Sequence, residues 1–335
     1  MHATPTDFRD ARVLVTGARG FLGRHLCRTL VQAGAIVIGV SRVVHPHAHV
    51  RRMNWSVVDM TDLVAVQTLV REAKPDIAFH LAGHVTGSQS VSEVQPTFGQ
   101  NLATTVHLLT SAQEAKTPRI VLAGSMHEPQ DGDPPTVPCS PYAASKTACT
   151  AYARMFHALY STPVVVARPM MVYGPGQWDV RKLLPYVVTS MLRGTQPAVA
   201  SGTRMLDWVY VEDVINGLMK VGSTAGLEGL TIDLGTGSLV SVRSIVERVA
   251  AITGASVPVA FGAVPDRLLE IPRAARTART RELIGWQATT SLGEGLRKTI
   301  EWWRQGAAES NNGEIVNLAA SLPQDASISH REPFA

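Results

Sequence analysis

Short apolar runs alternate with segments of helical period along the first half of the chain, from Val13 onwards. This alternation is typical of a parallel sheet with helices on both faces. The stretch RVLVTGARGFLGRHLCRTLVQAG is predicted to form a strand, a glycine turn and an amphipathic helix. Further strands are predicted for AIVIGVSR, WSVVDM, DIAFHLAG and RIVLAGS. Strands and helices in this succession predict an α/β fold with a doubly wound parallel sheet of the Rossmann type.

The composition limits the number of packed units, the possible partners and the cellular compartment that we expect for this chain. A chain of 335 residues, 45% of them hydrophobic, has room for about two packed units. The net charge is only +4, and no lysine–arginine block interleaved with aromatic residues is present, so we expect no nucleic-acid partner. Three irregularly spaced cysteines predict neither a disulfide framework nor a metal site, and they fit a reducing cytoplasm. No run approaches the roughly 20 apolar residues that span a bilayer, and the N-terminus has no signal-peptide pattern, so a soluble cytoplasmic protein without a membrane partner is expected.

Three glycines, Gly17, Gly20 and Gly23, lie where the first strand turns into the first helix. In a dinucleotide-binding turn the first glycine allows the tight bend, the second lets the backbone approach a pyrophosphate, and the third permits close helix packing. The helix N-terminus then supplies N–H groups to the anion. Glycines also close ordinary turns, but their position between this strand and this helix favours dinucleotide binding, with Phe21 and Leu22 in the same turn.

The end of the second strand distinguishes between the two nicotinamide dinucleotides. An acidic residue there would bind the ribose 2′-hydroxyl of NAD, whereas this chain has Ser41 and Arg42. A guanidinium and a hydroxyl suit a 2′-phosphate, and Arg19 in the glycine turn adds a second positive charge. NADP(H) is therefore predicted in preference to NAD(H). In the alternative interpretation both arginines are only solvated.

Three histidines, His45, His47 and His49, follow at a spacing of two. In an extended strand they would share one side and could hold a metal ion. Pro46 interrupts the run, and no nearby carboxylate or cysteine completes a coordination shell. A loop over the adenine end of the cofactor is therefore predicted rather than a metal site.

Tyr142 and Lys146 stand four residues apart at the start of a predicted helix, so their side chains share one face. A phenol transfers protons near neutral pH when its anion is stabilised, and a neighbouring ammonium provides that stabilisation. Ser125 follows the apolar strand RIVLAG, which places its hydroxyl at the carboxyl edge of the sheet, where ligands bind in open α/β folds. Tyrosine and lysine at this spacing also occur on ordinary surface helices, but together with the serine they form the acid–base apparatus of a reductase.

The sequence resembles the extended short-chain dehydrogenase/reductase family, the group of nucleotide-sugar epimerases, dehydratases and 4-ketoreductases. The resemblance covers about residues 11–304 and includes Asp59, Asn101 and Ser125. The longer motifs that carry it occur in family order and are TGARGFLG, VVDMTD, PDIAFHLAG, NLATTVHLL, YAASK, RPMMVYGPGQ, DWVYVEDV, DLGTGSLVSV and LIGWQATTSLGEGL.

This resemblance implies a role for each member of the site. Tyr142 would donate or accept the proton, Lys146 would stabilise its anion and hold the nicotinamide ribose, and Ser125 would orient the carbonyl. Asp59 would contact the adenine, which is compatible with its being the N-cap of the following helix. The other residues expected along the cofactor are Met60, Leu81, Ala82, Gly83, Asn101 and Arg168. A homodimer through the helices that carry Asn101 and Tyr142 is also implied.

At several positions this chain differs from the family motifs, and these differences affect which substrate and reaction we expect. Dehydratases carry acidic residues directly after the catalytic hydroxyl, but this chain has Met126 and His127, which disfavours dehydration. Glu128 and His127 would either face the substrate or belong to a loop. Leu206 stands where relatives have a diphosphate-binding arginine, and Met171 where they have an asparagine, although arginines at shifted positions can still neutralise a diphosphate. The residues expected at the substrate are His84, Met126, His127, Glu128, Met171, Arg181, Arg204 and Arg267.

The expected domain boundaries follow the family pattern. Residues 1–168 and 206–234 are predicted to form the dinucleotide-binding domain, and residues 169–205 and 235–305 a smaller C-terminal α/β lobe that binds the substrate. The small polar segment 306–335 is predicted to be a loosely held tail.

The sequence thus predicts an NADPH-dependent ketoreductase that reduces the 4-keto group of a nucleotide-linked sugar, with Tyr142 as the proton donor. One alternative is a nucleotide-sugar 4-epimerase with bound NAD, and another is a reductase of a non-nucleotide, natural-product ketone. A third is a binding or sensor protein that keeps the fold without catalysis. Such proteins typically lose the tyrosine or the lysine, and both are present here.

Overall fold

The computed structural model describes residues 7–43, 53–134 and 136–311, with the backbone alone for residues 307–311. His45, His47 and His49 therefore lie outside the described residues. The chain divides into two compact units. The first unit lies within Met1–Val172, Leu206–Leu239 and Leu268–Thr289, and the second within Tyr173–Met205, Val240–Arg267 and Thr290–Ala335.

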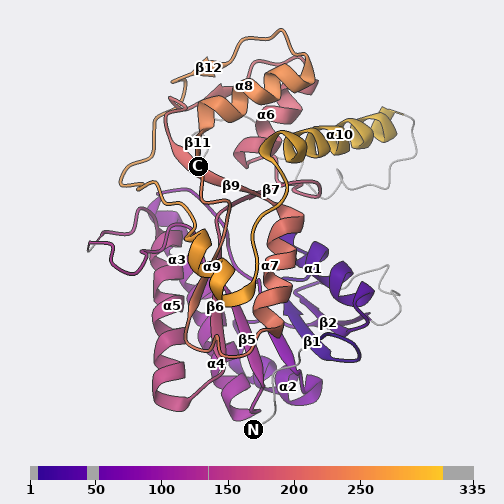
Figure 1. Ribbon diagram of the computed structural model, residues 1–335, viewed down its shortest axis with the longest axis vertical. Helices are drawn as coiled ribbons and strands as arrows, with labels where there is room; N and C mark the ends of the chain where they lie inside the picture. The colour runs from indigo at the N-terminus through magenta and orange to yellow at the C-terminus, as the bar shows by residue number, and fades with distance from the viewer. Residues whose placement is uncertain (1–6, 44–52, 135, 312–335) are drawn as a thin grey trace. The chain divides into compact units, whose positions relative to one another are not determined.

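A seven-stranded sheet forms the centre of the first unit (Figure 1). The strands are β1 (Arg12–Thr16), β2 (Ile36–Ser41), β3 (Met53–Val57), β4 (Ile77–His80), β5 (Arg119–Ala123), β6 (Val164–Pro169) and β10 (Thr231–Leu234). Their order is β10-β6-β5-β4-β1-β2-β3, and each neighbouring pair is parallel. The predicted doubly wound sheet is confirmed. Its order reverses between β1 and β4, and ligands of open α/β sheets bind at the carboxyl edge next to such a reversal.

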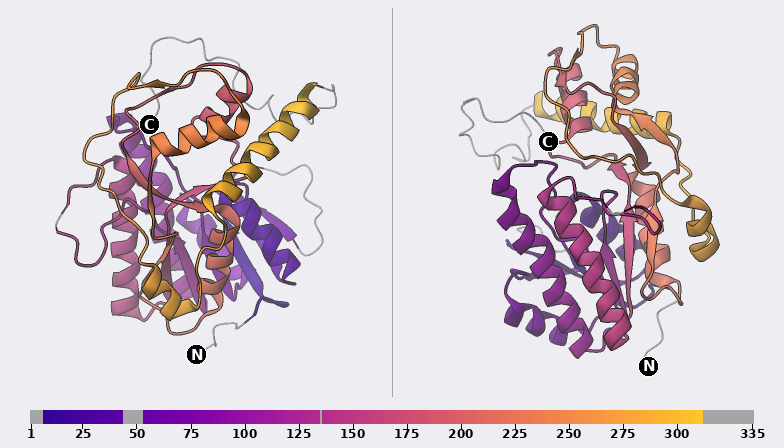
Figure 2. Two further views of the ribbon diagram at one scale, coloured as in Figure 1. Left: turned by 45° about the horizontal axis from the view of Figure 1, so that its top comes forward. Right: turned by 90° about the vertical axis from the view of Figure 1, so that its left-hand side faces the viewer.

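Helices cover both faces of this sheet (Figures 1 and 2). They are α1 (Phe21–Gln32), α2 (Leu63–Ala73), α3 (Val94–Thr97), α4 (Thr104–Glu114), α5 (Pro141–Tyr160), α7 (Val211–Ser223) and α9 (Thr277–Ile284), with a 3-10 turn η1 (Val91–Glu93) and a π-helical turn η2 (Phe98–Ala103). Successive strand residues point to opposite faces. Ala78 of β4 accordingly packs in one core cluster with Val66 of α2, whereas a Cβ added to Gly222 of α7 would lie 2.7 Å from the ring of Phe79.

The second unit contains three longer helices and a short parallel pair of strands. Helices α6 (Leu183–Leu192), α8 (Val242–Thr253) and α10 (Leu292–Asn311) pack against one another. Strand β8 (Ala198–Val199) pairs with β12 (Ala260–Phe261) in parallel. A separate sheet of order β11-β9-β7 is formed by β7 (Met171–Tyr173), β9 (Met205–Tyr210) and β11 (Leu239–Ser241), and most of β7 and β9 falls within the first unit.

The two units place residues 169–172, 235–239 and 268–289 with the parallel sheet, whereas the sequence assigned these residues to the smaller lobe. Asp207 gives the physical reason. Its buried carboxylate accepts hydrogen bonds from the backbone N–H groups of Thr236, Gly237 and Ala275 at 2.8, 2.9 and 2.9 Å. Thr280 adds a hydrogen bond from its hydroxyl to the Asp233 carbonyl on β10 at 2.8 Å. The Thr280 bond holds the late segment against β10 of the parallel sheet, and the Ala275 bond holds it against β9.

Helix α10 continues to Asn311, so the segment predicted as a tail from residue 306 begins inside a helix. Residues 312–335 lie outside the described residues. Among the helices that the structure describes, none has both the length and the apolar character required to cross a bilayer.

Candidate active site

The turn between β1 and α1 requires glycine at two of its three predicted positions. Gly17 has a φ of +68°, and a Cβ there would lie 2.7 Å from the backbone nitrogen of Ala82, which follows β4. A Cβ on Gly23 would lie 2.1 Å from the Gly17 carbonyl oxygen. The close approach of helix, turn and neighbouring strand therefore excludes any side chain at either position.

This turn fits the pyrophosphate of a dinucleotide. Gly20 is the N-cap residue of α1 and has no side chain to occupy the helix N-terminus, where backbone N–H groups attract anions. Its own N–H bonds to the Gly17 carbonyl at 2.9 Å, which closes the turn. Phe21 and Leu22 are half-buried in the first turn of the helix, and Arg19 is exposed beside it. The turn also lies after β1, next to the point where the strand order reverses.

The residues predicted at the adenosine end follow β2 and β3. Arg42 is exposed, and its charge contributes to keeping the pKa of Asp59 below the usual range, after the larger effect of hydrogen bonds from Thr61. Those bonds run from the Thr61 backbone N–H at 2.9 Å and hydroxyl at 2.8 Å to Asp59 Oδ1. Asp59 is not the N-cap of α2, because Asp62 has that role. The Ser41 hydroxyl donates to the Val43 carbonyl at 2.5 Å and is thus turned onto its own backbone.

The loop after β4 is fixed by Asn101 on the π-helical turn. Its Oδ1 accepts from the His84 N–H at 2.6 Å, and its Nδ2 donates to the His84 carbonyl at 3.2 Å and to Ser145 Oγ at 2.9 Å. Asn101 therefore joins the loop to α5 and uses both amide hydrogens, and its contact with the cofactor stays a prediction. A Cβ on Gly83 would lie 2.7 Å from Asn101 Oδ1, so the loop approaches this amide closely. Leu81 and Ala82 are half-buried between β4 and Gly83, and Met60 is buried beyond β3.

Helix α5 positions the predicted catalytic pair. Ser140 is its N-cap, with Oγ accepting from the Ala143 N–H at 3.1 Å, and Pro141 occupies the first turn, as is common at helix starts. Tyr142 and Lys146 then follow on one face and are 8% and 6% exposed. Lys146 Nζ donates to the Ala123 carbonyl at 2.8 Å. The ammonium therefore lies at the carboxyl end of β5.

Ser125 lies two residues beyond that carbonyl and is 5% exposed. Its Oγ accepts a hydrogen bond from the His127 N–H at 3.3 Å, which leaves the hydroxyl hydrogen for another acceptor. The His127 ring stands edge-to-face with the Tyr142 ring, with 6.5 Å between the centroids. The structure thus brings the serine and the lysine to the end of β5, and the histidine beside the tyrosine.

Glu128 has a structural role that differs from its predicted contact with the substrate. Its carboxylate is 1% exposed and accepts from the Ser125 N–H at 2.5 Å and from the Thr150 hydroxyl at 2.5 Å. Burial raises the pKa of this carboxyl, while those hydrogen bonds and the charges of Arg168 and Lys146 oppose the shift. The side chain turns back into the protein and holds the turn that carries Ser125.

The other residues of the first unit that were predicted at the substrate differ from one another in burial and in their contacts. His84 is half-buried, and its Nε2 lies 2.6 Å from a carboxylate oxygen of Glu93. Met126 is buried after Ser125, and Met171 is half-buried at the start of β7. Thus the turn after β5 brings Met126 and His127 close to the serine, while His84 is already paired.

The arginines predicted at the ligands are distributed over both units. Arg168, which was predicted at the cofactor, is 5% exposed. Its Nε donates to Asp233 at 2.7 Å, and its Nη1 donates to the Pro129 carbonyl at 2.9 Å. The contact with Asp233 is an ion pair between β6 and β10. Arg181 is exposed in the second unit and is paired with Asp179 at 2.8 Å, so its charge is already balanced. Arg204 and Arg267 are half-buried in the second unit, and their contact with a diphosphate stays a prediction.

Sequence reasoning missed His80 at the end of β4. It is 3% exposed, with Thr16 Oγ1 at 2.8 Å from its Nδ1 and Thr104 Oγ1 at 3.4 Å from its Nε2. Burial, and secondarily the charge of Lys146, lowers its pKa to about 3, so the ring is neutral. Thr16 Oγ1 also accepts a hydrogen bond from the Ala82 N–H at 3.2 Å. His80 therefore helps to hold the end of β1 against the loop that follows β4. A polar residue ending the apolar run IAFH was the available signal.

Comparisons with known proteins agree with this geometry. A model of the NAD dependent epimerase/dehydratase family matches residues 13–235. A UDP-glucose 4-epimerase of Mycolicibacterium smegmatis is 31% identical over 312 residues, covering 88% of this chain and 98% of that protein. The structure of an epimerase of Methanothermobacter thermautotrophicus has a TM-score of 0.82 at 25% identity and covers 91% of this chain and 96% of the other. MoeE5 in complex with UDP-glucuronic acid and NAD has a TM-score of 0.79 at 29% identity, covering 88% and 99%.

Proposed function

Since the chain belongs to the NAD-dependent epimerase/dehydratase family, we propose that it transfers hydride between a nicotinamide dinucleotide and a carbon of a nucleotide-linked sugar. The observation that carries this proposal is the hydrogen bond from Lys146 Nζ to the Ala123 carbonyl at 2.8 Å. It holds a buried ammonium at the end of β5, two residues before Ser125 and on the face of α5 that also carries Tyr142. Those are the three groups that carbonyl reduction and alcohol oxidation require.

The protein's part in the reaction is the movement of one proton at the phenolic oxygen of Tyr142. In the reducing direction the phenol gives its proton to the substrate carbonyl oxygen, and in the oxidising direction the phenolate takes the proton of the alcohol. Lys146 places its buried ammonium on the same face of α5 as Tyr142. Ser125 donates to the substrate oxygen, since its Oγ already accepts from the His127 N–H and keeps its own hydrogen. The nicotinamide, when bound, supplies or accepts the hydride.

The same residues serve two net reactions. In 4-epimerisation one carbon is oxidised and then reduced again, so the bound cofactor is regenerated in each cycle. The name of the Mycolicibacterium relative and the NAD of the MoeE5 complex support this reaction. In ketoreduction the cofactor is consumed and exchanged. The absence of an acidic residue after β2, where the chain has Ser41 and the exposed Arg42, supports NADPH and hence this second candidate.

The two candidates separate in one set of assays on the purified full chain. The nucleotide released on denaturation is identified as NAD or NADP. The protein is then incubated with UDP-glucose without added cofactor, and the formation of UDP-galactose is followed by chromatography. In parallel, NADPH oxidation is followed with a nucleotide-linked 4-keto sugar. Epimer formation with bound NAD supports the first candidate, and stoichiometric NADPH oxidation supports the second.

Two tyrosines of α5 provide a test variant and its matched control. Tyr142→Phe removes the proposed proton carrier, whereas Tyr152→Phe changes a tyrosine of α5 that is 40% exposed. Turnover should disappear in the first variant and persist in the second. A chain that binds the dinucleotide and turns over neither class of sugar would refute the enzymatic proposal and favour a sensor.

A further inference from the structure

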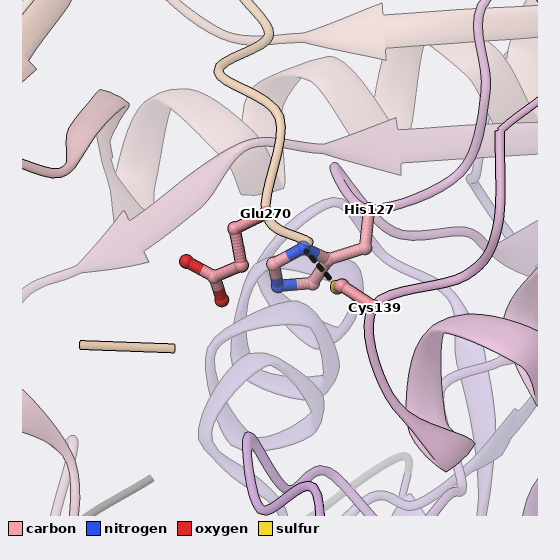
Figure 3. A group of neighbouring side chains, drawn as sticks. All are labelled: His127, Cys139 and Glu270. Atoms are coloured by element: carbon pink, nitrogen blue, oxygen red, sulfur yellow. Dashed lines mark hydrogen bonds between the residues drawn. The ribbon is translucent and has the colours of Figure 1, made fainter. Parts of the chain in front are cut away.

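Three potential metal ligands of the first unit lie together although they are far apart in the sequence. The ligand atoms of His127, Cys139 and Glu270 are all within 4.8 Å of one another (Figure 3). They come from the turn after β5, from the residue before the N-cap of α5, and from the segment that precedes α9. We propose that these three side chains bind a zinc ion beside Tyr142. Its ligand side chains are distinct from the three side chains proposed for hydride transfer, although the site adjoins the ring of Tyr142.

The separation of the ligand atoms is close to that in a zinc complex. Cys139 Sγ lies 3.7 Å from His127 Nδ1. Zinc bonds of about 2.3 Å to sulfur and about 2.0 Å to nitrogen, at a tetrahedral angle, separate these two atoms by about 3.5 Å. Glu270 is half-buried, and a rotation of its side chain that moves the carboxylate by about 1 Å brings its oxygen to bonding distance.

The backbone on two sides of the cluster is held by a single amide side chain. Gln89 Nε2 donates to the carbonyl of Cys139 at 2.5 Å and to that of Leu268 at 2.9 Å, and its Oε1 accepts from the Leu268 N–H at 3.3 Å. Leu268 lies two residues before Glu270. An ion pair of 2.8 Å between Arg273 and Asp133 joins the same two segments further along. The segments that carry the thiol and the carboxylate are therefore fixed to each other before any metal binds.

The donor set identifies the kind of metal. Imidazole nitrogen, thiolate sulfur and carboxylate oxygen together suit zinc, whereas magnesium and calcium prefer oxygen alone. One thiolate and one carboxylate also neutralise the charge of a divalent cation. Cys139 is the residue before the N-cap of α5, and a metal ion binds a cysteine side chain as the thiolate. The sequence predicted no metal site because these ligands have no recognisable spacing.

Three protein ligands leave the fourth tetrahedral position open, as in catalytic rather than structural zinc sites. The His127 ring stands edge-to-face with that of Tyr142 at 6.5 Å, so an ion on His127 lies next to the phenol. A water molecule or a substrate oxygen can occupy the open position. We therefore expect zinc binding to change the turnover of the enzyme as well as the reactivity of Cys139.

Cobalt(II) is the probe of choice because a cysteine thiolate bound to it gives a charge-transfer band in the near ultraviolet, and tetrahedral coordination gives strong visible bands. The metal-free, phosphine-reduced full chain is titrated with Co²⁺, and Zn²⁺ is then added as a competitor. The expected result is one equivalent of bound cobalt with both sets of bands, which Zn²⁺ removes. An absence of the charge-transfer band at saturating Co²⁺ would overturn the proposal.

Variants of two of the three ligands test the roles of the thiol and the carboxylate. Cys139→Ser should abolish the charge-transfer band, and Glu270→Gln should weaken Co²⁺ binding at least ~10-fold, the lower bound for loss of a supporting ligand. The matched controls are Cys149→Ala, which removes a buried thiol, and Glu282→Gln, which removes an exposed carboxylate of α9. Both should titrate like the unaltered chain. Circular dichroism verifies that each variant is folded, and a charge-transfer band that persists in folded Cys139→Ser would refute the assignment.

Discussion

The buried His80 makes the stability of the first unit depend on pH in a defined window. Its ring is 3% exposed, and burial together with the charge of Lys146 lowers its pKa to about 3. The perturbation is His80→Asn, because the asparagine amide nitrogen can replace Nδ1 in the hydrogen bond with Thr16 Oγ1, which is 2.8 Å long. The variant keeps a polar partner for Thr16 and removes the group that titrates.

The sign and size of the effect follow from proton linkage. The unfolded chain protonates this imidazole below about pH 6.5, whereas the folded protein keeps it neutral down to a pH of about 3. Between these values the unfolded state binds more protons, so the free energy of unfolding falls as the pH falls, by about 1.4 kcal/mol per pH unit. Above about pH 6.5 His80 is neutral in both states, so the free energy of unfolding loses nothing through this residue. Lowering the pH to about 5 removes about 2 kcal/mol through His80 alone.

Urea unfolding at pH 7.5 and at pH 5 measures this quantity for the unaltered chain and for His80→Asn. Carboxylates and other histidines titrate equally in both proteins and cancel in the difference between them. The unaltered chain should lose about 2 kcal/mol more than the variant on acidification. The same loss in both proteins would show that His80 takes up its proton in the folded state, and the reasoning from burial would be wrong.

Four further predictions concern the cofactor, the reaction and assembly. Tyr142→Phe should reduce turnover at least ~10²-fold with little change in dinucleotide affinity, and unchanged turnover would exclude the proposed proton transfer. Arg42→Asp should shift the ratio of NADPH to NADH affinities toward NADH, measured by cofactor fluorescence; an unaltered ratio would mean that the 2′-phosphate is read elsewhere. Gly23→Ala places a methyl group 2.1 Å from the Gly17 carbonyl, so dinucleotide binding and thermal stability should both fall, and normal binding would contradict the close packing of this turn. A homodimer through the helices that carry Asn101 and Tyr142 should double the mass measured by light scattering, and a monomer at all concentrations would remove this expectation.

The sequence predicted the first five strands of the sheet. Four of them, β1, β2, β4 and β5, are largely buried and are nearly continuous apolar runs, whereas the edge strand β3 is only partly buried. The sequence did not identify β6 and β10 as the remaining strands. Arg168 and Asp233 interrupt those two runs with charges, which are compensated only when the strands pair and the carboxylate accepts from Nε at 2.7 Å. A pattern read along one strand contains no information about such a partner.

The site was predictable where local backbone geometry determines the role. Gly23 is required by a close approach within its own turn, and Gly17 by the approach of the loop after β4. Tyr142 and Lys146 share a face because of helical periodicity. Side-chain direction was not predictable. Glu128 could have faced the substrate, but its carboxylate binds the Ser125 N–H instead, because the turn after β5 points it into the core.

The four hydrogen bonds on the Asp207 carboxylate have a consequence for the synthesis of this protein. Three come from Thr236 and Gly237, and the fourth comes from Ala275, so a ribosome makes the acceptor long before the last donor. A nascent chain that ends before Ala275 must leave part of this carboxylate to water, and its first unit stays incomplete while residues 240–267 of the smaller unit are translated. A fragment that ends after β10 would also lack the hydrogen bond from Ala275. The dinucleotide affinity of such a fragment would therefore not represent the affinity of the whole chain.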